Sequence, residues 1–149
     1  MGSRQSLQKR KDDSVLNGNI YKDVQIPGDV SRVISKFILA LSDGYFYPCM
    51  IMRPTTDGYV VYFFYLKEER EIPSNVIIGN LWYLINCEVS FTDINGNIAT
   101  GRIVGTDFKS TDTDREQPMN FFIYCNDACR TISFPYIFLS TQQARMLCG

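Results

Sequence analysis

Short apolar runs separated by polar turns make up the chain from Val33 onward. The first half contains VISKFILAL, YFYPCMIMR and YVVYFFYL, and an Asp-Gly pair precedes the second and the third run. Asp-Gly between two apolar runs of strand length is typical of a β-hairpin. After the charged stretch KEEREIPSN comes one more short run, Val76 to Ile78. The pattern predicts about four or five strands in roughly 45 residues, which form a small curled barrel more readily than a sandwich.

The second half of the chain repeats this arrangement. CEVSF and IATGRIVGT flank TDINGN, in which Asn95-Gly96 predicts a hairpin with a type I′ turn. MNFFIYC and ACRTISF flank another turn, Asn-Asp, and the polar segment 107–116 is expected to be an exposed loop. The sequence therefore predicts an all-β fold of two small SH3-like barrels in tandem, packed together.

A short C-terminal helix is predicted in LSTQQARML. Ser140 is a good N-cap, and Gln143 can bond back to it as in a capping box. Leu139 can pack on Ala144 across the cap, and Leu147 lies on the same helix face as Ala144. We expect this helix to pack on the second barrel.

Three segments follow from this pattern: a flexible N-terminal tail over 1–29, a first barrel over 30–79, and a second barrel with the helix over 80–149. Each barrel alone is too small to bury much surface, so the two barrels are expected to pack together. The linker GNLWYLIN is apolar, and its residues 82–84 are expected to be buried where the barrels meet. Alternation along a strand places every second side chain inside. The predicted interior residues are Phe37, Leu39, Met50, Met52, Val61, Phe63, Val89, Ile103, Phe122 and Ile132.

The predicted tail opens with MGSRQS, which matches the N-myristoylation pattern and has basic residues nearby. Met1-Gly2-Ser3 is equally typical of the residue left by an expression tag. We favour the second interpretation.

Composition narrows the functional classes. The chain has 149 residues and a net charge of −1, and its fifteen basic residues form no long stripe, which argues against a dominant electrostatic nucleic-acid binder. A weak DNA contact through stacking and scattered cations stays an alternative. Its basic residues would be Lys36, Arg53, Arg70 and Lys109. Apolar runs stay far below the ~20 residues that cross a bilayer, so no membrane association is expected.

Histidine is absent from the sequence, which excludes histidine-based general base catalysis and histidine metal sites. The five cysteines are scattered, and the close pair in CNDAC has no second pair beside it to complete a zinc site. We therefore expect no enzyme activity, no metal and no cofactor.

The apolar runs also resemble a known family. SDGYFYPCMIMRPTTDGYVVYFFY followed by EREIPSNVI looks like a Tudor domain, and CEVSF, GRIVG and IFLSTQQARML resemble the second repeat and terminal helix of a tandem Tudor region. The resemblance is to the tandem Tudor region of the tumour suppressor p53-binding protein 1 family, DNA-damage checkpoint mediators, as a divergent homologue of invertebrate type. It covers residues 33–147.

In that family the first Tudor domain binds dimethyl-lysine of histone H4 in a cage of four aromatic residues and one aspartate. By resemblance, the cage tyrosine is Tyr47, and the phenylalanine that ends the third strand is Phe64. The cage tryptophan is replaced by Ala40, the aspartate by Leu66, and the last tyrosine by Glu68.

Three of the five cage positions therefore differ, which predicts weakened or altered binding of a methylammonium group. Glu68 could replace the carboxylate of the missing aspartate. If the alignment with the family is shifted by one residue around YLKEE, Tyr65 falls at a cage position.

The resemblance implies a non-catalytic, nuclear, chromatin-associated module of a DNA-damage response mediator. Its implied partners are a histone tail, through methyl-lysine, and other DNA-damage response proteins. Alternatives are a module whose cage has decayed and which binds another protein or itself, and a small-barrel nucleic-acid binder.

Overall fold

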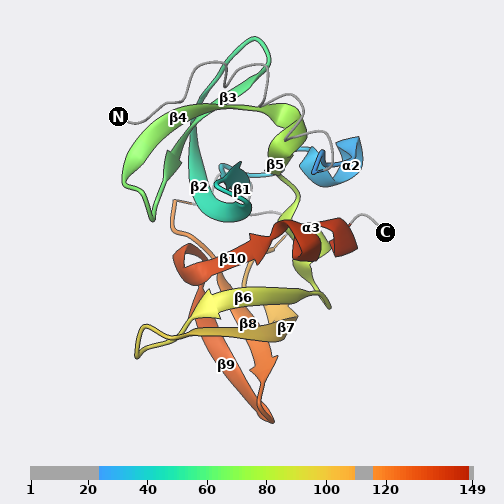
Figure 1. Ribbon diagram of the computed structural model, residues 1–149, viewed down its shortest axis with the longest axis vertical. Coiled ribbons are helices and arrows are strands. Elements are labelled where there is room, and N and C mark those ends of the chain that lie inside the picture. Colours follow the sequence, from blue (N-terminus) through green and yellow to red (C-terminus); the bar gives the residue numbers. More distant parts are fainter. Residues whose placement is uncertain (1–23, 110–115, 148–149) are drawn as a thin grey trace.

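The structure is a computed structural model that describes residues 24–109 and 116–147. All strands of these residues join one antiparallel sheet, with the path β4-β3-β2-β10-β6-β7-β8-β9, while β1 pairs with β2 and β5. Strands β1 to β5 curl into one barrel and β6 to β10 into a second, whose last strand, β10, also pairs with β2 of the first barrel (Figure 1). The structure confirms the predicted tandem of SH3-like barrels.

The first barrel has five strands. These are β1 (Phe37–Ser42), β2 (Tyr45–Pro54), β3 (Gly58–Phe63), β4 (Glu68–Pro73) and β5 (Ile77–Ile78), with a 3-10 turn η1 (Ser74–Val76) before β5. Asp43 and Gly44, with φ of 53° and 85°, make the tight β1–β2 turn that the Asp-Gly signal predicts. The pairing of β2 with β3 shifts register between Ile51 and Arg53, and this bulge leaves Met52 exposed, contrary to prediction.

The second barrel consists of β6 (Glu88–Thr92), β7 (Ile98–Thr106), β8 (Asn120–Cys125), β9 (Ala128–Ser133) and β10 (Ile137–Ser140). The β6–β7 turn is not of the predicted type I′. The N–H of Gly96 donates to the carbonyl of Asp93, and Gly96 has φ of 81° while Asn95 is not among the residues with positive φ. This is a type I turn followed by a glycine bulge, and the Asp93 carboxylate holds it by accepting from two N–H groups, of Asn95 and Asn97.

Most of the predicted interior residues are buried. Phe37, Leu39, Val61, Phe63, Val89 and Ile103 are in the core, while Met50, Phe122 and Ile132 are half-buried. In β8 the neighbouring Phe121 takes the interior place. Because Phe121 and Phe122 are adjacent and identical in type, the hydrophobic pattern alone does not show which of the two faces the interior.

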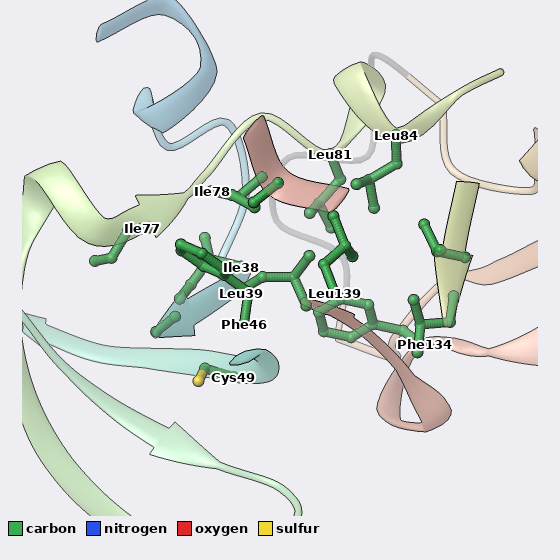
Figure 2. Close-up of a cluster of buried hydrophobic side chains, with 14 of the residues drawn as sticks. Ile38, Leu39, Phe46, Cys49, Ile77, Ile78, Leu81, Leu84, Phe134 and Leu139 are labelled. Atoms are coloured by element: carbon green, nitrogen blue, oxygen red, sulfur yellow. The ribbon is translucent and has the colours of Figure 1, made fainter. Parts of the chain in front are cut away.

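Strand β10 (Ile137–Ser140) joins the two barrels into one body. Its first half pairs with β6, with Ile137 opposite Phe91, and its second half pairs with β2, with Leu139 opposite Phe46. Leu139 and Phe46 are fully buried and lie within one core cluster that also contains Phe134 of the short 3-10 turn η3 (Phe134–Tyr136), as Figure 2 shows.

The linker between the barrels forms a 3-10 turn, η2 (Leu81–Leu84). The prediction that residues 82–84 are all buried is wrong for Trp82 and Tyr83. Residues three apart share a face of such a turn, so Leu81 and Leu84 point into the core while Trp82 and Tyr83 point outward and are more than one-third exposed. The Tyr83 hydroxyl donates to the Asp29 carboxylate at 2.9 Å.

The folded part begins earlier than the predicted boundary at residue 30. Val24 and Ile26 are buried, and the N–H of Ile26 donates to the carbonyl of Asn75. A one-turn helix, α2 (Gly28–Ser31), packs against the start of the linker, where the carbonyl of Val30 accepts from Gly79 and Asn80. The rest of the predicted tail, with its MGSRQS motif, lies outside the described residues, as do positions 110–115 of the predicted loop.

The C-terminal helix α3 (Thr141–Leu147) has the predicted capping box. The N–H of Gln143 donates to Ser140 Oγ at 3.0 Å, and the N–H of Ser140 donates back to Gln143 Oε1 at 2.9 Å. Ala144 and Leu147 are buried as predicted. Within the described residues no helix has the length and apolar character needed to span a bilayer.

Candidate functional site

Four aromatic rings gather where the two barrels meet, and we call them the aromatic rim: Tyr45, Tyr47, Tyr65 and Phe138. Tyr47 is central, because its ring lies 6.0 Å from Tyr45, 5.6 Å from Tyr65 and 6.0 Å from Phe138. Tyr45 and Phe138 also contact each other at 5.9 Å. Tyr45 and Tyr65 are 42% and 72% exposed, so the rim is open to solvent.

Strand alternation places the two β2 tyrosines on the rim. Phe46 between them is fully buried and faces the joint core, so Tyr45 and Tyr47 point to the opposite side of the strand. Tyr47 is half-buried, and its ring is partly covered by its three neighbours. The Gly-Tyr-Phe-Tyr motif therefore supplies one core ring and two rim rings.

Tyr65 reaches the rim from the connection between β3 and β4. Lys67, with φ of 57°, closes this turn, and its N–H donates to the carbonyl of Phe63 at 2.8 Å. The ring of Tyr65 stacks on that of Tyr47 with an interplanar angle of 12°. The structure thus brings together two of the predicted cage candidates, Tyr47 and Tyr65.

Phe64 lies apart from this pair. Its ring packs against Phe37 at 6.5 Å, Tyr62 at 5.8 Å and Phe134 at 6.4 Å, in a cluster at the junction of the barrels. Phe64 and Tyr65 lie in the turn between β3 and β4, and their ring contacts place them apart: Phe64 packs on Phe37 and Phe134, whereas Tyr65 stacks on Tyr47.

Glu68 is held by Arg70, whose Nε donates to the carboxylate at 2.5 Å while the same guanidinium donates to Ser42 Oγ at 3.0 Å. Ala40 lies directly opposite Tyr47 on β1 and is fully buried, and Leu66 is half-buried against the core. Neither Ala40 nor Leu66 can supply an aromatic wall or a carboxylate.

The surroundings of Tyr47 favour its neutral form. Burial raises the pKa of the Tyr47 hydroxyl, and the nearby Tyr65, Tyr45 and Asp43 raise it further, because a phenolate is repelled by other negative charge close to it. Tyr47 therefore keeps its proton at neutral pH. Asp43 lies in the β1–β2 turn, two residues before Tyr45.

Sequence reasoning missed Tyr45, Phe138 and Asp43 as site residues. Tyr45 could have been predicted, because side chains two residues apart on a strand lie on the same face and Tyr45 is two residues before Tyr47. Phe138 comes from the other barrel, and its approach depends on the pairing of β10 with β2, which local patterns do not reveal.

Lys36, Arg53 and Arg70, which were considered for DNA contact, are each paired with a carboxylate. Lys36 contacts Glu116 at 3.2 Å, Arg53 contacts Glu69 at 3.7 Å, and Arg70 contacts Glu68. Each pairing lowers the positive potential that a phosphate backbone would meet.

The four cysteines of the described residues are free thiols. Cys125 and Cys129 flank the tight turn at Asn126 and Asp127, and burial raises the pKa of the Cys49 thiol, which disfavours the thiolate. Among the described residues, no group of three or more His, Cys, Asp and Glu side chains is placed to hold a metal ion.

With this geometry in view, the fold is similar to a crystal structure of the Crb2 tandem tudor domains. The TM-score is 0.53 and the sequence identity 18%, and the match covers 76% of this chain and 83% of that chain. The chain has a tandem Tudor fold. No family model matches the sequence, and no curated protein matches it.

Proposed function

We propose that this chain is a non-catalytic binding module that takes a methylated lysine of a chromatin protein, such as a histone tail, on the aromatic rim. The observation that carries the proposal is the cluster of four rings around Tyr47, open to solvent on a tandem Tudor fold. A role in a nuclear DNA-damage response mediator, alongside other proteins of that response, is part of the proposal and rests on the family resemblance.

The chemistry of the rim suits an alkylated ammonium group. Such a cation is weakly hydrated and is attracted to ring faces within ~6 Å, with about 0.5–2 kcal/mol for each good contact. Burial raises the pKa of the Tyr47 hydroxyl, so the central ring of the rim presents an uncharged π-face to a cation at neutral pH. The cage differs from that of the resembled family, because Ala40 and Leu66 remove a wall and a carboxylate.

A peptide titration tests the proposal. Histone-tail peptides with un-, mono-, di- and trimethyl-lysine are added to the ¹⁵N-labelled protein, and chemical shifts and affinities are measured. We expect at least one methylated peptide to bind more tightly than its unmethylated form, and Tyr47→Ala to lower that affinity by about tenfold.

Tyr124→Ala is the matched control, because this tyrosine is also partly exposed (45%) but lies on β8 of the second barrel. It should bind like the wild type. If no methylated peptide shifts the resonances of the rim, methyl-lysine binding at this site is rejected.

A further inference from the structure

Phe138 belongs to the second barrel yet forms a wall of the rim on the first. Leu139 and Ser140 lie opposite Phe46 and Tyr45 in the β10–β2 ladder, so the preceding residue, Phe138, comes level with Tyr47. Its ring lies 6.0 Å from Tyr47 and 5.9 Å from Tyr45. It thus supplies an aromatic surface to a rim that has lost the wall at Ala40.

The backbone that carries Phe138 is fixed on both sides. Phe138 pairs with Ser90 of β6, and the Ser90 hydroxyl donates to Gln143 Oε1 at 3.1 Å. The same oxygen accepts from the N–H of Ser140 at 2.9 Å. Little ordering is therefore needed at Phe138 when a ligand binds, which favours affinity.

The hydrogen-bond acceptors beside the rim are the second relevant feature. A mono- or dimethylammonium group keeps at least one N–H, and burying this donor without a partner is unfavourable. At the two cage positions that follow Phe64 in the family resemblance, Leu66 offers no acceptor and the Glu68 carboxylate is ion-paired with Arg70. A trimethylammonium group has no N–H, and its third methyl group adds a contact to the rings.

We propose that the rim prefers trimethyl-lysine to dimethyl- and monomethyl-lysine, and that Phe138 is one of the rings that contact the cation. This inference rests on the proposed methyl-lysine function. It assigns the selectivity of the site to residues of both barrels, and the site is incomplete without the second one.

Calorimetry with one histone-tail peptide sequence in its four methylation states tests the preference, together with an analogue in which a neutral tert-butyl group replaces trimethylammonium. Affinity should rise with each methyl group, by about threefold or more from di- to trimethyl-lysine, and the neutral analogue should bind about tenfold more weakly. Phe138→Leu should lower the affinity for the trimethyl peptide by about 3- to 30-fold while changing that for the neutral analogue by less than about twofold.

Two further variants separate contact from structure. Phe138→Tyr keeps a ring and should retain the preference, and Tyr136→Leu, a matched change at an exposed ring two residues earlier, should bind like the wild type. Unchanged affinity in Phe138→Leu, or equal losses for the charged and neutral peptides, would overturn the role of Phe138.

Asp43, in the β1–β2 turn two residues before Tyr45, is the carboxylate to test as an alternative acceptor. Tighter binding of the dimethyl than of the trimethyl peptide, with the difference removed by Asp43→Asn, would overturn the preference while leaving methyl-lysine binding in place. Failure of every methylated peptide to bind would reject both the inference and the proposed function.

Discussion

The two barrels share a hairpin plan but differ at the ends of their strands. In the first barrel, β2 begins with Tyr45-Phe46-Tyr47, and the β3–β4 connection carries Tyr65. In the second, β7 begins with Ile98-Ala99-Thr100, and the β8–β9 connection is the two-residue turn of Asn126 and Asp127. The same backbone plan thus presents aromatic rings in one barrel and none at the corresponding strand start in the other.

The comparison shows that the barrel backbone alone does not make a binding site. A site forms only where the side chains at the strand ends are suited to a ligand. The second barrel contributes in another way, because β10 carries Phe138 to the rim and Leu139 into the joint core. It acts as the support and as one wall of a site that lies mainly on the first barrel.

The largest loss of stability is expected from a large-to-small substitution in the core that the two barrels share. Phe46→Ala removes a fully buried ring that lies opposite Leu139, and it should lower the free energy of unfolding by about 3–5 kcal/mol. Denaturant unfolding followed by tryptophan fluorescence and by far-UV circular dichroism measures the change.

Because the core is shared, the wild type should unfold in a single transition with both probes. Two separate transitions, with Phe46→Ala affecting one of them alone, would show that the barrels are independent units.

Tyr65→Ala is expected to have a smaller effect, on peptide affinity rather than on stability. It tests whether the exposed rings of the first barrel bind the ligand. Tyr65 is 72% exposed, so its removal should change stability by less than about 0.5 kcal/mol. It should nevertheless weaken binding of a methylated peptide by about 3- to 10-fold, because a ring stacked on Tyr47 is lost. Calorimetry and thermal unfolding measure the two quantities, and a loss of binding that merely follows a loss of stability would contradict a direct contact.

The capping box of α3 should have an effect of about 1 kcal/mol. Ser140→Ala removes the hydroxyl that accepts from the N–H of Gln143, and Gln143 also accepts from Ser90 beside Phe138. We expect a modest loss of stability by urea unfolding and, because the support of Phe138 loosens, a small loss of peptide affinity. Ser133→Ala, outside this network, serves as the control.

The smallest effect is expected from Glu68→Gln. This carboxylate is half-exposed and paired with Arg70, and exposed ion pairs contribute about 0–1 kcal/mol. If Glu68 is not an acceptor for the ligand, peptide affinity stays within about twofold of wild type in calorimetry. A large loss confined to the mono- and dimethyl peptides would assign the acceptor role to Glu68.

Much of the fold could be predicted from local patterns. The turns at Asp43-Gly44 and Asn126-Asp127, the burial of Phe37, Leu39, Val61 and Phe63, and the capping box at Ser140 all appear in the structure. These features depend on interactions among residues close in sequence, which a single sequence displays directly.

The site was predictable only in part, because it depends on pairing between distant strands. Tyr47 and Tyr65 were among the predicted candidates, whereas Phe64, in the turn after β3, packs on Phe37 and Phe134 instead. Phe138 lies 91 positions from Tyr47 (138 − 47) and meets it through the β10–β2 ladder. No local period carries that information.

The most direct test of the central claim is a map of ligand-induced chemical shifts for a trimethyl-lysine histone-tail peptide. Our account predicts that the largest changes fall on Tyr45, Tyr47 and Tyr65 of the first barrel and, at the same peptide concentrations, on Phe138 of the second. Changes confined to residues away from these four rings, or on the first barrel with Phe138 unaffected, would contradict a site built by both barrels.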